Sequence, residues 1–149
     1  MAIRTATAEW KGDLPSGTGA FSGASGELDG GYSFKSRFTE AGGTNPEELV
    51  AAAHASCFSM FLAGVLAQGG NAAESVRTEA KVQILKVGEG FDVTKIDLLT
   101  VGRVPGIDDA AFQQAAQVAK ENCPISKALG AVPEITLDAT LETEAAARG

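Results

Sequence analysis

One long stretch without a charged residue constrains the fold of this chain more than any other feature. Leu49 to Gln68 consists mainly of Ala, Leu and Phe, with Asn45-Pro46 before it and Gly69-Gly70 after it. An Asn N-cap, a Pro at the first helical position and a Gly beyond the last turn are typical helix boundaries, so the pattern predicts one helix. Because this helix is apolar around most of its circumference, we expect it to be buried on nearly all sides.

The sequence before this helix predicts short antiparallel strands. Ile3–Trp10 and Tyr32–Phe38 alternate between apolar and polar residues, as half-buried strands do. Gly17–Gly23 fits a thin strand or a loop, and Asp29-Gly30-Gly31 predicts a turn.

The sequence after the helix predicts a hairpin, a second helix and a final strand. Val76–Val87 and Phe91–Val101 alternate and are separated by Gly88-Glu89-Gly90, which indicates a β-hairpin. A helix is expected from Asp108 or Asp109 through Ala119, and Glu134–Leu141 has the alternation of a last strand.

This order of elements predicts an α+β fold in a single domain, residues 1–149. Strands and helices do not alternate as βαβ units, so we expect largely antiparallel sheets. One small sheet cannot cover a helix that is apolar all round. We therefore predict antiparallel sheets wrapped around a buried central helix in an intertwined homodimer, with an interface larger than that of a transient contact.

Composition excludes several classes of partner. The 149 residues include 12 basic and 19 acidic side chains, a net charge of −7, and no basic cluster, so neither nucleic acid nor an anionic membrane is expected as a partner. The central helix has the length of a membrane span, but small residues dominate it and no basic flank follows. No apolar signal run follows Met1, so a cytoplasmic location is expected.

The chain has two cysteines, Cys57 and Cys123, and one histidine, His54. In a reducing compartment the cysteines are core thiols, metal ligands or redox catalysts rather than a permanent disulfide. They lie 66 positions apart, so there is no CxxC motif, and two Cys with one His cannot fill a four-ligand zinc site. We expect no metal and no cofactor. A separated pair suits a two-cysteine peroxidase, in which one thiol resolves the sulfenic acid of the other.

Catalysis by Cys57 requires a cation nearby, because the thiolate is the nucleophile and the ordinary thiol pKa is about 8.5. His54, three residues earlier, and Arg37 are the candidates. Each has an ordinary structural alternative: Cys57 packs as a small apolar residue, His54 is a hydrogen-bonded core residue, and Arg37 is a solvated strand end.

A carboxylate from the first turn of the central helix is positioned to orient Arg37. If Asn45 caps the helix, Glu48 occupies the capping-box position and Glu47 is free to face the arginine. Glu47 lies ten positions before Cys57, about 15 Å along a straight helix. Either Arg37 bridges that gap or the helix breaks between the two residues.

Cys123 precedes Pro124, which suits the first position of a short helix. A thiol at the N-cap meets the positive helix end, which favours the thiolate. The alternative is that Cys123 is an inert buried thiol.

Three motifs resemble the signature of the OsmC/Ohr hydroperoxide reductases: Thr44-Asn45-Pro46-Glu47-Glu48-Leu49, Ala52-Ala53-His54-Ala55-Ser56-Cys57-Phe58 and Cys123-Pro124-Ile125-Ser126. Ala8-Glu9-Trp10 and Val104-Pro105-Gly106-Ile107 extend the resemblance over nearly the whole chain. Arg37 in a Ser-Arg-Phe context, together with His54, is similar to the OsmC branch.

The resemblance implies a function, a site and partners. Cys57 would be the peroxidatic cysteine, Cys123 the resolving cysteine, and Arg37 with Glu47 the pair that holds the thiolate and orients the peroxide. It implies a homodimer that reduces organic hydroperoxides, and also hydrogen peroxide, in oxidative or osmotic stress defence. A dithiol reductant, typically a lipoyl group, would then reduce the disulfide.

Two other functions remain open on the residues alone. The first is a non-catalytic dimeric protein that binds a small hydrophobic ligand in an apolar groove around Phe58 and Phe61. The second is a Cys-His acyl-transfer enzyme, for which His54 would matter as much as Arg37.

Overall fold

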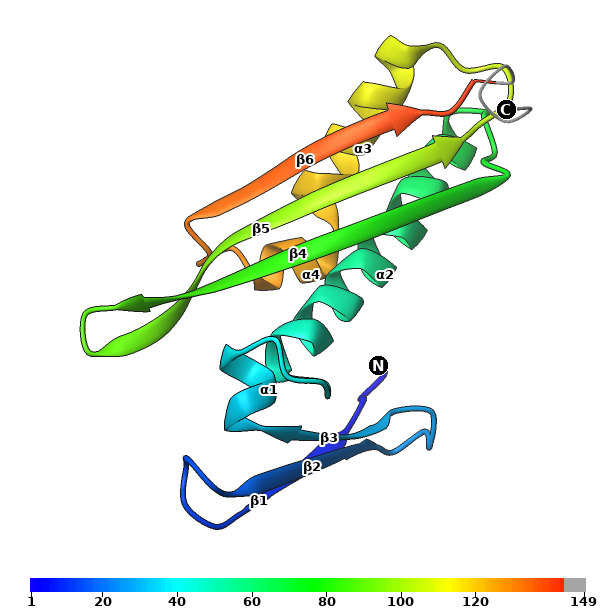
Figure 1. Ribbon diagram of the computed structural model, residues 1–149. Coiled ribbons are helices and arrows are strands. Elements are labelled where there is room, and N and C mark those ends of the chain that lie inside the picture. Colours follow the sequence, from blue (N-terminus) through cyan, green and yellow to red (C-terminus); the bar gives the residue numbers. More distant parts are fainter. Residues whose placement is uncertain (144–149) are drawn as a thin grey trace. The chain divides into compact units, whose positions relative to one another are not determined.

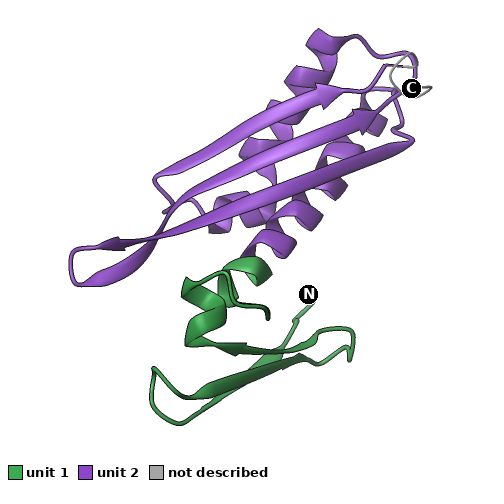
Figure 2. Cartoon of the chain, in the orientation of Figure 1, with its two compact units in different colours: residues 1–49 green, residues 50–149 purple. Residues whose placement is uncertain are grey.

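The computed structural model describes residues 1–143 and has the predicted α+β class. The chain divides into two compact units, Met1–Leu49 and the part that begins at Val50 (Figure 2). The elements in chain order are β1 (Ala6–Lys11), β2 (Thr18–Gly23), β3 (Asp29–Ser33), α1 (Phe34–Phe38), α2 (Pro46–Gln68), β4 (Ser75–Val87), β5 (Gly90–Arg103), α3 (Asp109–Asn122), α4 (Pro124–Ala128) and β6 (Glu134–Leu141) (Figure 1).

The first unit holds an antiparallel sheet in the order β1-β2-β3. The thin segment Gly17–Gly23 forms a strand, β2, but the turn expected at Asp29-Gly30-Gly31 is wrong, because these residues begin β3. Gly30 is needed for packing across the sheet: a Cβ there would come within 2.7 Å of the Phe21 ring. The reversal of the chain lies before β3, where Gly26 has a φ of +80°.

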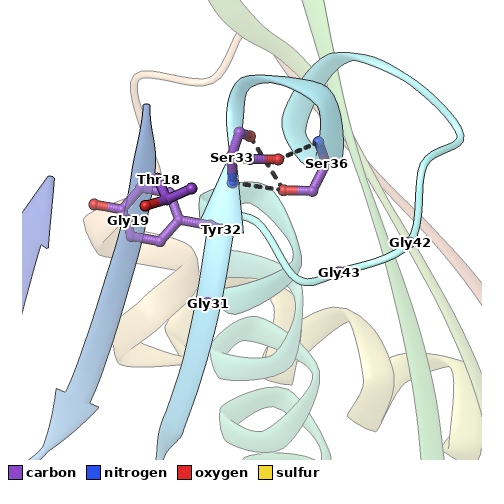
Figure 3. A pocket seen from close by; sticks show the side chains of 8 residues that line it. All are labelled: Thr18, Gly19, Gly31, Tyr32, Ser33, Ser36, Gly42 and Gly43. Atoms are coloured by element: carbon purple, nitrogen blue, oxygen red, sulfur yellow. Dashed lines mark hydrogen bonds between the residues drawn. The ribbon is translucent and has the colours of Figure 1, made fainter. Parts of the chain in front are cut away.

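The expected strand Tyr32–Phe38 is also wrong from Phe34 onward, because Phe34–Phe38 form the short helix α1. Ser33 and Ser36 cap its start reciprocally, since the Ser36 N–H donates to Ser33 Oγ at 3.1 Å and the Ser33 N–H to Ser36 Oγ at 2.9 Å (Figure 3). Two serines three residues apart form a capping box, which has the same alternating appearance in sequence as a strand.

Helix α2 begins and ends where the sequence predicts. The Glu48 N–H donates to Asn45 Oδ1 at 2.8 Å, which confirms Asn45 as the N-cap. At the other end the Asn71 N–H donates to the Leu66 carbonyl at 2.9 Å, and Gly70 has a φ of +87°. The helix is continuous from Pro46 to Gln68, so it does not break between Glu47 and Cys57.

The second unit holds a sheet in the order β4-β5-β6. The predicted hairpin is confirmed, with Val87 opposite Gly90 and the turn at Gly88-Glu89. The β5–β6 pair is parallel rather than antiparallel. Parallel neighbours need a crossover, and α3 and α4 provide it. Figure 1 shows α3 on the same face of this sheet as α2.

Within one chain, α2 is buried along one stripe only. His54, Phe58, Leu62 and Leu66 recur every fourth residue and are at most 2% exposed, and the three apolar residues among them pack with residues of β5 and α3 in one core cluster. A single chain therefore leaves part of α2 uncovered, and the burial on nearly all sides that was predicted for a homodimer is not reached within one chain. A three-stranded sheet covers one face of a helix, and Met60, on another face, is 75% exposed.

Candidate active site

The two cysteines lie together in the second unit although 66 positions separate them in sequence. Their sulfur atoms are 2.9 Å apart and share a hydrogen bond. Both thiols are free, and Cys123 is fully buried whereas Cys57 is half-buried. The separation is longer than the roughly 2.05 Å of a disulfide bond, so the pair is a reduced dithiol that needs little movement to close.

Pro124 accounts for the position of Cys123. It has no N–H to continue the hydrogen bonding of α3, and it starts α4 at a position where no donor is needed. Cys123 therefore ends α3, with its N–H donating to the Ala119 carbonyl at 2.8 Å, and also stands at the N-cap of α4. Its ψ of 124° is typical of a residue before proline. The predicted N-cap thiol is confirmed.

The two thiols differ in acidity. Burial raises the pKa of Cys57, the contact with Cys123 raises it further, and the Ile125 N–H opposes both effects. Burial also acts to raise the pKa of Cys123, but the Cys57 thiol, the N–H and hydroxyl of Ser126, and the Ile125 N–H together lower it below its ordinary value. Of the two thiols, Cys123 is therefore the more acidic.

The dipoles at the start of α4 act on the Cys123 sulfur without a short hydrogen bond. The Cys123 side chain makes no capping bond of standard geometry. The Ser126 and Ile125 N–H groups nevertheless lower the pKa of Cys123, which favours the thiolate. Within residues 1–143, no cationic side chain contributes to the pKa of Cys57.

In the first unit, Arg37 and Glu47 form an ion pair. Arg37 Nη2 donates to Glu47 Oε1 at 2.8 Å, and Arg37 Nε donates to the same oxygen at 3.1 Å. Glu47 is buried, and Glu48 is exposed with its N–H on the Asn45 cap, so Glu47 is the partner of the arginine. Arg37 lies in α1 rather than at a strand end.

The Arg37 side chain keeps part of its surface open. It is 41% exposed and lies beside a pocket of about 230 Å³. The pocket is lined by aromatic and apolar residues, by Ser33 and by Arg37 itself: Trp10, Leu14, Tyr32, Ser33, Phe34, Arg37, Phe38 and Pro46. The Arg37 guanidinium carbon is also 5.3 Å from the Phe38 ring centre. A fixed cation among apolar side chains suits a small anionic or polarised group that carries an alkyl chain.

His54 does not pair with Cys57. It is fully buried, and its Nε2 lies 2.7 Å from the Ser126 hydroxyl oxygen. Burial lowers the pKa of His54, so the ring is neutral at pH 7. Of the two roles that the sequence left open for His54, the structure shows the hydrogen-bonded core residue.

A groove of about 330 Å³ opens beside Cys57. It is lined mainly by apolar groups of α2 and by the proline of α4: Cys57, Met60, Phe61, Gly64, Val65, Gln68 and Pro124. Phe61 lines this groove as predicted, but Phe58 does not, since it is fully buried in the core. Figure 3 shows a different pocket, in the first unit, lined by glycines, hydroxyls and Tyr32, and neither thiol lies in it.

Sequence analysis missed Ser126 and the backbone donors around Cys123. The signal was present, because Ser126 is three residues after Cys123, the N3 position of the helix that Cys123 caps. Among residues 1–143 no group of three His, Cys, Asp or Glu side chains is arranged to hold a metal ion.

A family model described as OsmC-like protein matches residues 39–138, which include both thiols and Glu47. The chain belongs to the OsmC-like family. The resemblance seen in the three sequence motifs is therefore confirmed.

Two curated relatives and one solved structure illustrate the family. Peroxiredoxin OsmC of Escherichia coli (strain K12) is 47% identical over 137 residues, which covers 91% of this chain and 94% of that protein. The organic hydroperoxide resistance protein of Xanthomonas axonopodis pv. citri (strain 306) is 34% identical over 96 residues, 64% of this chain and 66% of that protein. The higher identity agrees with the predicted OsmC branch.

The organic hydroperoxide resistance protein OsmC from Legionella pneumophila has a similar crystal structure. The TM-score is 0.68 at 23% identity, over 96% of this chain and all of that chain. At this identity the likeness shows that the two proteins share the OsmC-like fold.

Proposed function

We propose that this protein is a cysteine-based peroxidase that reduces organic hydroperoxides to alcohols in oxidative or osmotic stress defence. The contact of 2.9 Å between two free thiols, one of them open to an apolar groove, carries the proposal. The names of the curated relatives, a peroxiredoxin and an organic hydroperoxide resistance protein, support it.

In the proposed first step, the Cys57 thiolate attacks the terminal peroxide oxygen. The S–O bond forms, the O–O bond breaks, and the alkoxide leaves and takes a proton to become the alcohol. Cys57 is thereby oxidised to the sulfenic acid. Because Cys57 is the less acidic of the two thiols, its proton has to leave before the attack, and the Cys123 thiolate can take this proton and then supply it to the alkoxide.

We assign the cation for this step to Arg37. A guanidinium stays charged, stabilises the Cys57 thiolate and favours the charge that develops on the leaving oxygen. Glu47 accepts hydrogen bonds from two N–H groups of Arg37, and the guanidinium keeps its positive charge. Glu47 is accordingly a positioning residue.

In the second step Cys123 attacks the Cys57 sulfenic acid. The S–S bond forms, the S–O bond breaks, and hydroxide leaves and is protonated by solvent to water. A dithiol of the lipoyl type then reduces the disulfide by thiol–disulfide exchange and is itself oxidised to a disulfide. The apolar groove beside Cys57 favours alkyl hydroperoxides over hydrogen peroxide, which is also a substrate, because burying an alkyl chain there is favourable.

We also propose that the working form is an intertwined homodimer in the cytoplasm and that residues 1–149 act as one OsmC-like domain. Helix α2 is long and apolar enough to cross a membrane by length and composition, and 22% of that span is buried within one chain. The apolar surface of α2 that one chain leaves open is covered by a second copy, which removes the need for a membrane. The family match across residues 39–138, which spans both units, supports a single domain.

The decisive experiment measures consumption of an alkyl hydroperoxide with a dithiol reductant in Cys57→Ser and Cys123→Ser. Cys57→Ser should lose all turnover. Cys123→Ser should consume one peroxide and accumulate the Cys57 sulfenate, detected by mass spectrometry. Unchanged turnover in both variants would support the alternative, a non-catalytic dimeric protein that binds a small hydrophobic ligand.

A further inference from the structure

A buried histidine and serine lie behind the resolving thiol. His54 of α2 is 0% exposed and Ser126 of α4 is 8% exposed, and His54 Nε2 lies 2.7 Å from Ser126 Oγ. Ser126 is the N3 residue of the helix that Cys123 caps, and its hydroxyl and its N–H both lower the pKa of Cys123. The four side chains therefore form a continuous row: His54, Ser126, Cys123 and Cys57.

The surroundings of His54 indicate its tautomer. Within residues 1–143, the buried Nδ1 atom has no hydrogen-bond partner. Buried donors without a partner are rarer in proteins than buried acceptors without one, so the proton belongs on Nε2 and Nδ1 carries the lone pair. The neutral ring is consistent with the lowered pKa of His54.

This tautomer fixes the direction of the next hydrogen bond. If His54 Nε2–H donates to Ser126 Oγ, that oxygen acts as acceptor toward the histidine. The single hydroxyl hydrogen of Ser126 is then free to point at the Cys123 sulfur. Hydrogen bonds to an ionised acceptor are the stronger kind, so this donor favours thiolate over thiol.

We propose that His54 and Ser126 are positioning residues for the resolving step, in which they hold Cys123 as a thiolate aimed at the Cys57 sulfenic acid. The proposal rests on the two-cysteine cycle proposed above and assigns it two further residues. The titratable group that contacts Cys123 directly is Cys57, while His54 acts through Ser126.

The two chemical steps should respond to this pair in opposite ways. A donor on Cys123 makes it a poorer acceptor of the Cys57 proton, so removing the donor leaves sulfenic acid formation unchanged or faster. The same change raises the pKa of Cys123 and leaves less thiolate for the second step. Well below the pKa, each unit by which the pKa rises leaves about tenfold less thiolate. The remaining thiolate is about threefold more nucleophilic, because the Brønsted coefficient is near 0.5. Disulfide formation should therefore slow about threefold for each unit.

The test is a single-turnover experiment on the reduced full-length protein with one equivalent of cumene hydroperoxide. Sulfenic acid and disulfide are quantified separately, by dimedone trapping and by mass, between pH 5.5 and 9. In Ser126→Ala we expect slower disulfide formation at pH 6, a rate that reaches or exceeds wild type at pH 9, and unchanged or faster formation of the sulfenic acid.

Three further variants control for structure. Ser126→Thr keeps the hydroxyl and should retain the wild-type pH profile, and His54→Gln keeps a side-chain N–H and should lie between wild type and Ser126→Ala. Ser59→Ala removes a hydroxyl of α2, which donates to Thr78 Oγ1 at 2.7 Å, and should leave the profile unchanged.

The outcomes separate this proposal from the proposed function. Disulfide formation in Ser126→Ala at the wild-type rate at pH 6 would overturn the role of the pair. An equal slowing at pH 6 and pH 9 would also overturn it. Such a result would indicate a distorted site, because slowing by distortion does not depend on whether Cys123 is protonated. If wild-type protein forms no Cys57 sulfenic acid and no disulfide, the peroxidase function itself fails.

Discussion

At the scale of single residues, the two thiols differ in what surrounds each sulfur. Cys123 has backbone and hydroxyl donors from α4, whereas Cys57 has burial and a neighbouring thiol that both keep it protonated. A peroxidatic cysteine has to be a thiolate. A peroxidase with this pair of thiols would need a charge that acts on Cys57 specifically, and this is the role that we propose for the Arg37–Glu47 pair.

Replacing Arg37 by Ala should slow the reaction of Cys57 with hydroperoxide by about 100-fold, the effect typical of removing one donor that stabilises developing charge. Because the Cys57 pKa is already raised by burial, its rate should increase with pH, and Arg37→Ala should move that increase to higher pH. Stopped-flow measurement of sulfenic acid formation tests both effects. Lys35→Ala, which removes the other basic residue of α1, is the control and should behave as wild type.

Glu47→Gln should have a smaller effect of the same kind. The amide oxygen can still accept both hydrogen bonds from Arg37, but the negative charge that strengthens them is lost. We expect a loss of a few-fold in the rate of sulfenic acid formation. Glu48→Gln, at the exposed neighbouring position, should leave that rate unchanged, and an equal loss in both variants would remove Glu47 from the site.

Buried His54 should make the protein less stable in acid. Its pKa is lowered by burial, so below the ordinary value of 6.5 the unfolded chain takes up a proton that the folded chain refuses. The free energy of unfolding should therefore fall as pH drops below 6.5. Urea unfolding at pH 7.5 and pH 5.5 should show a larger loss in the free energy of unfolding for wild type than for His54→Gln. An equal loss would show that His54 takes up a proton as readily in the folded chain as in the unfolded chain.

At the scale of elements, boundaries with a defined chemistry could be predicted from sequence, whereas segments governed by packing could not. Asn45, Gly70 and Pro124 each impose a local geometry, and α2 and α4 begin or end at them. The Asp29-Gly30 segment and α1 were misassigned. Gly30 makes room for the Phe21 ring of the neighbouring strand, and a serine capping box has the same alternation as a strand.

The candidate site shows the same difference between what local chemistry determines and what packing determines. Cys57, Cys123, Arg37 and Glu47 could be selected from sequence, because each belongs to a residue type with a chemical role and to a motif. The contact between the thiols could not be derived from spacing, since a crossover through α3 and α4 brings Cys123 back to α2. Ser126 acts through an oxygen whose role depends on His54, a residue 72 positions away.

The α3–α4 junction gives a prediction at this scale. Pro124→Ala restores an N–H and removes the restraint on Cys123, so α3 can continue through this point. We expect disulfide formation after peroxide addition to slow several-fold while sulfenic acid formation is retained. Pro133→Ala, at the proline just before β6, is the matched control, and equal slowing in both variants would argue against the junction as the cause.

At the scale of the whole molecule, one side of α2 is left uncovered in a single chain, and Met60 lies exposed on it. Exposed apolar helix surface of this kind is covered in a stable protein, by a partner or by lipid. The chain carries a net charge of −7 and no basic cluster, which disfavours anionic lipid. A second copy is the partner that the predicted homodimer supplies.

Met60 tests this explanation because it is 75% exposed on α2 in one chain. If a second copy covers α2, Met60→Glu buries an unpaired charge, which costs several kcal/mol and should raise the dimer dissociation constant about 100-fold or more. Analytical ultracentrifugation at micromolar concentration should show a wild-type dimer and a Met60→Glu monomer. Val118→Glu, at an α3 residue that is 38% exposed, should remain dimeric. A wild-type protein that is monomeric at that concentration would mean that α2 is left open or covered by something else.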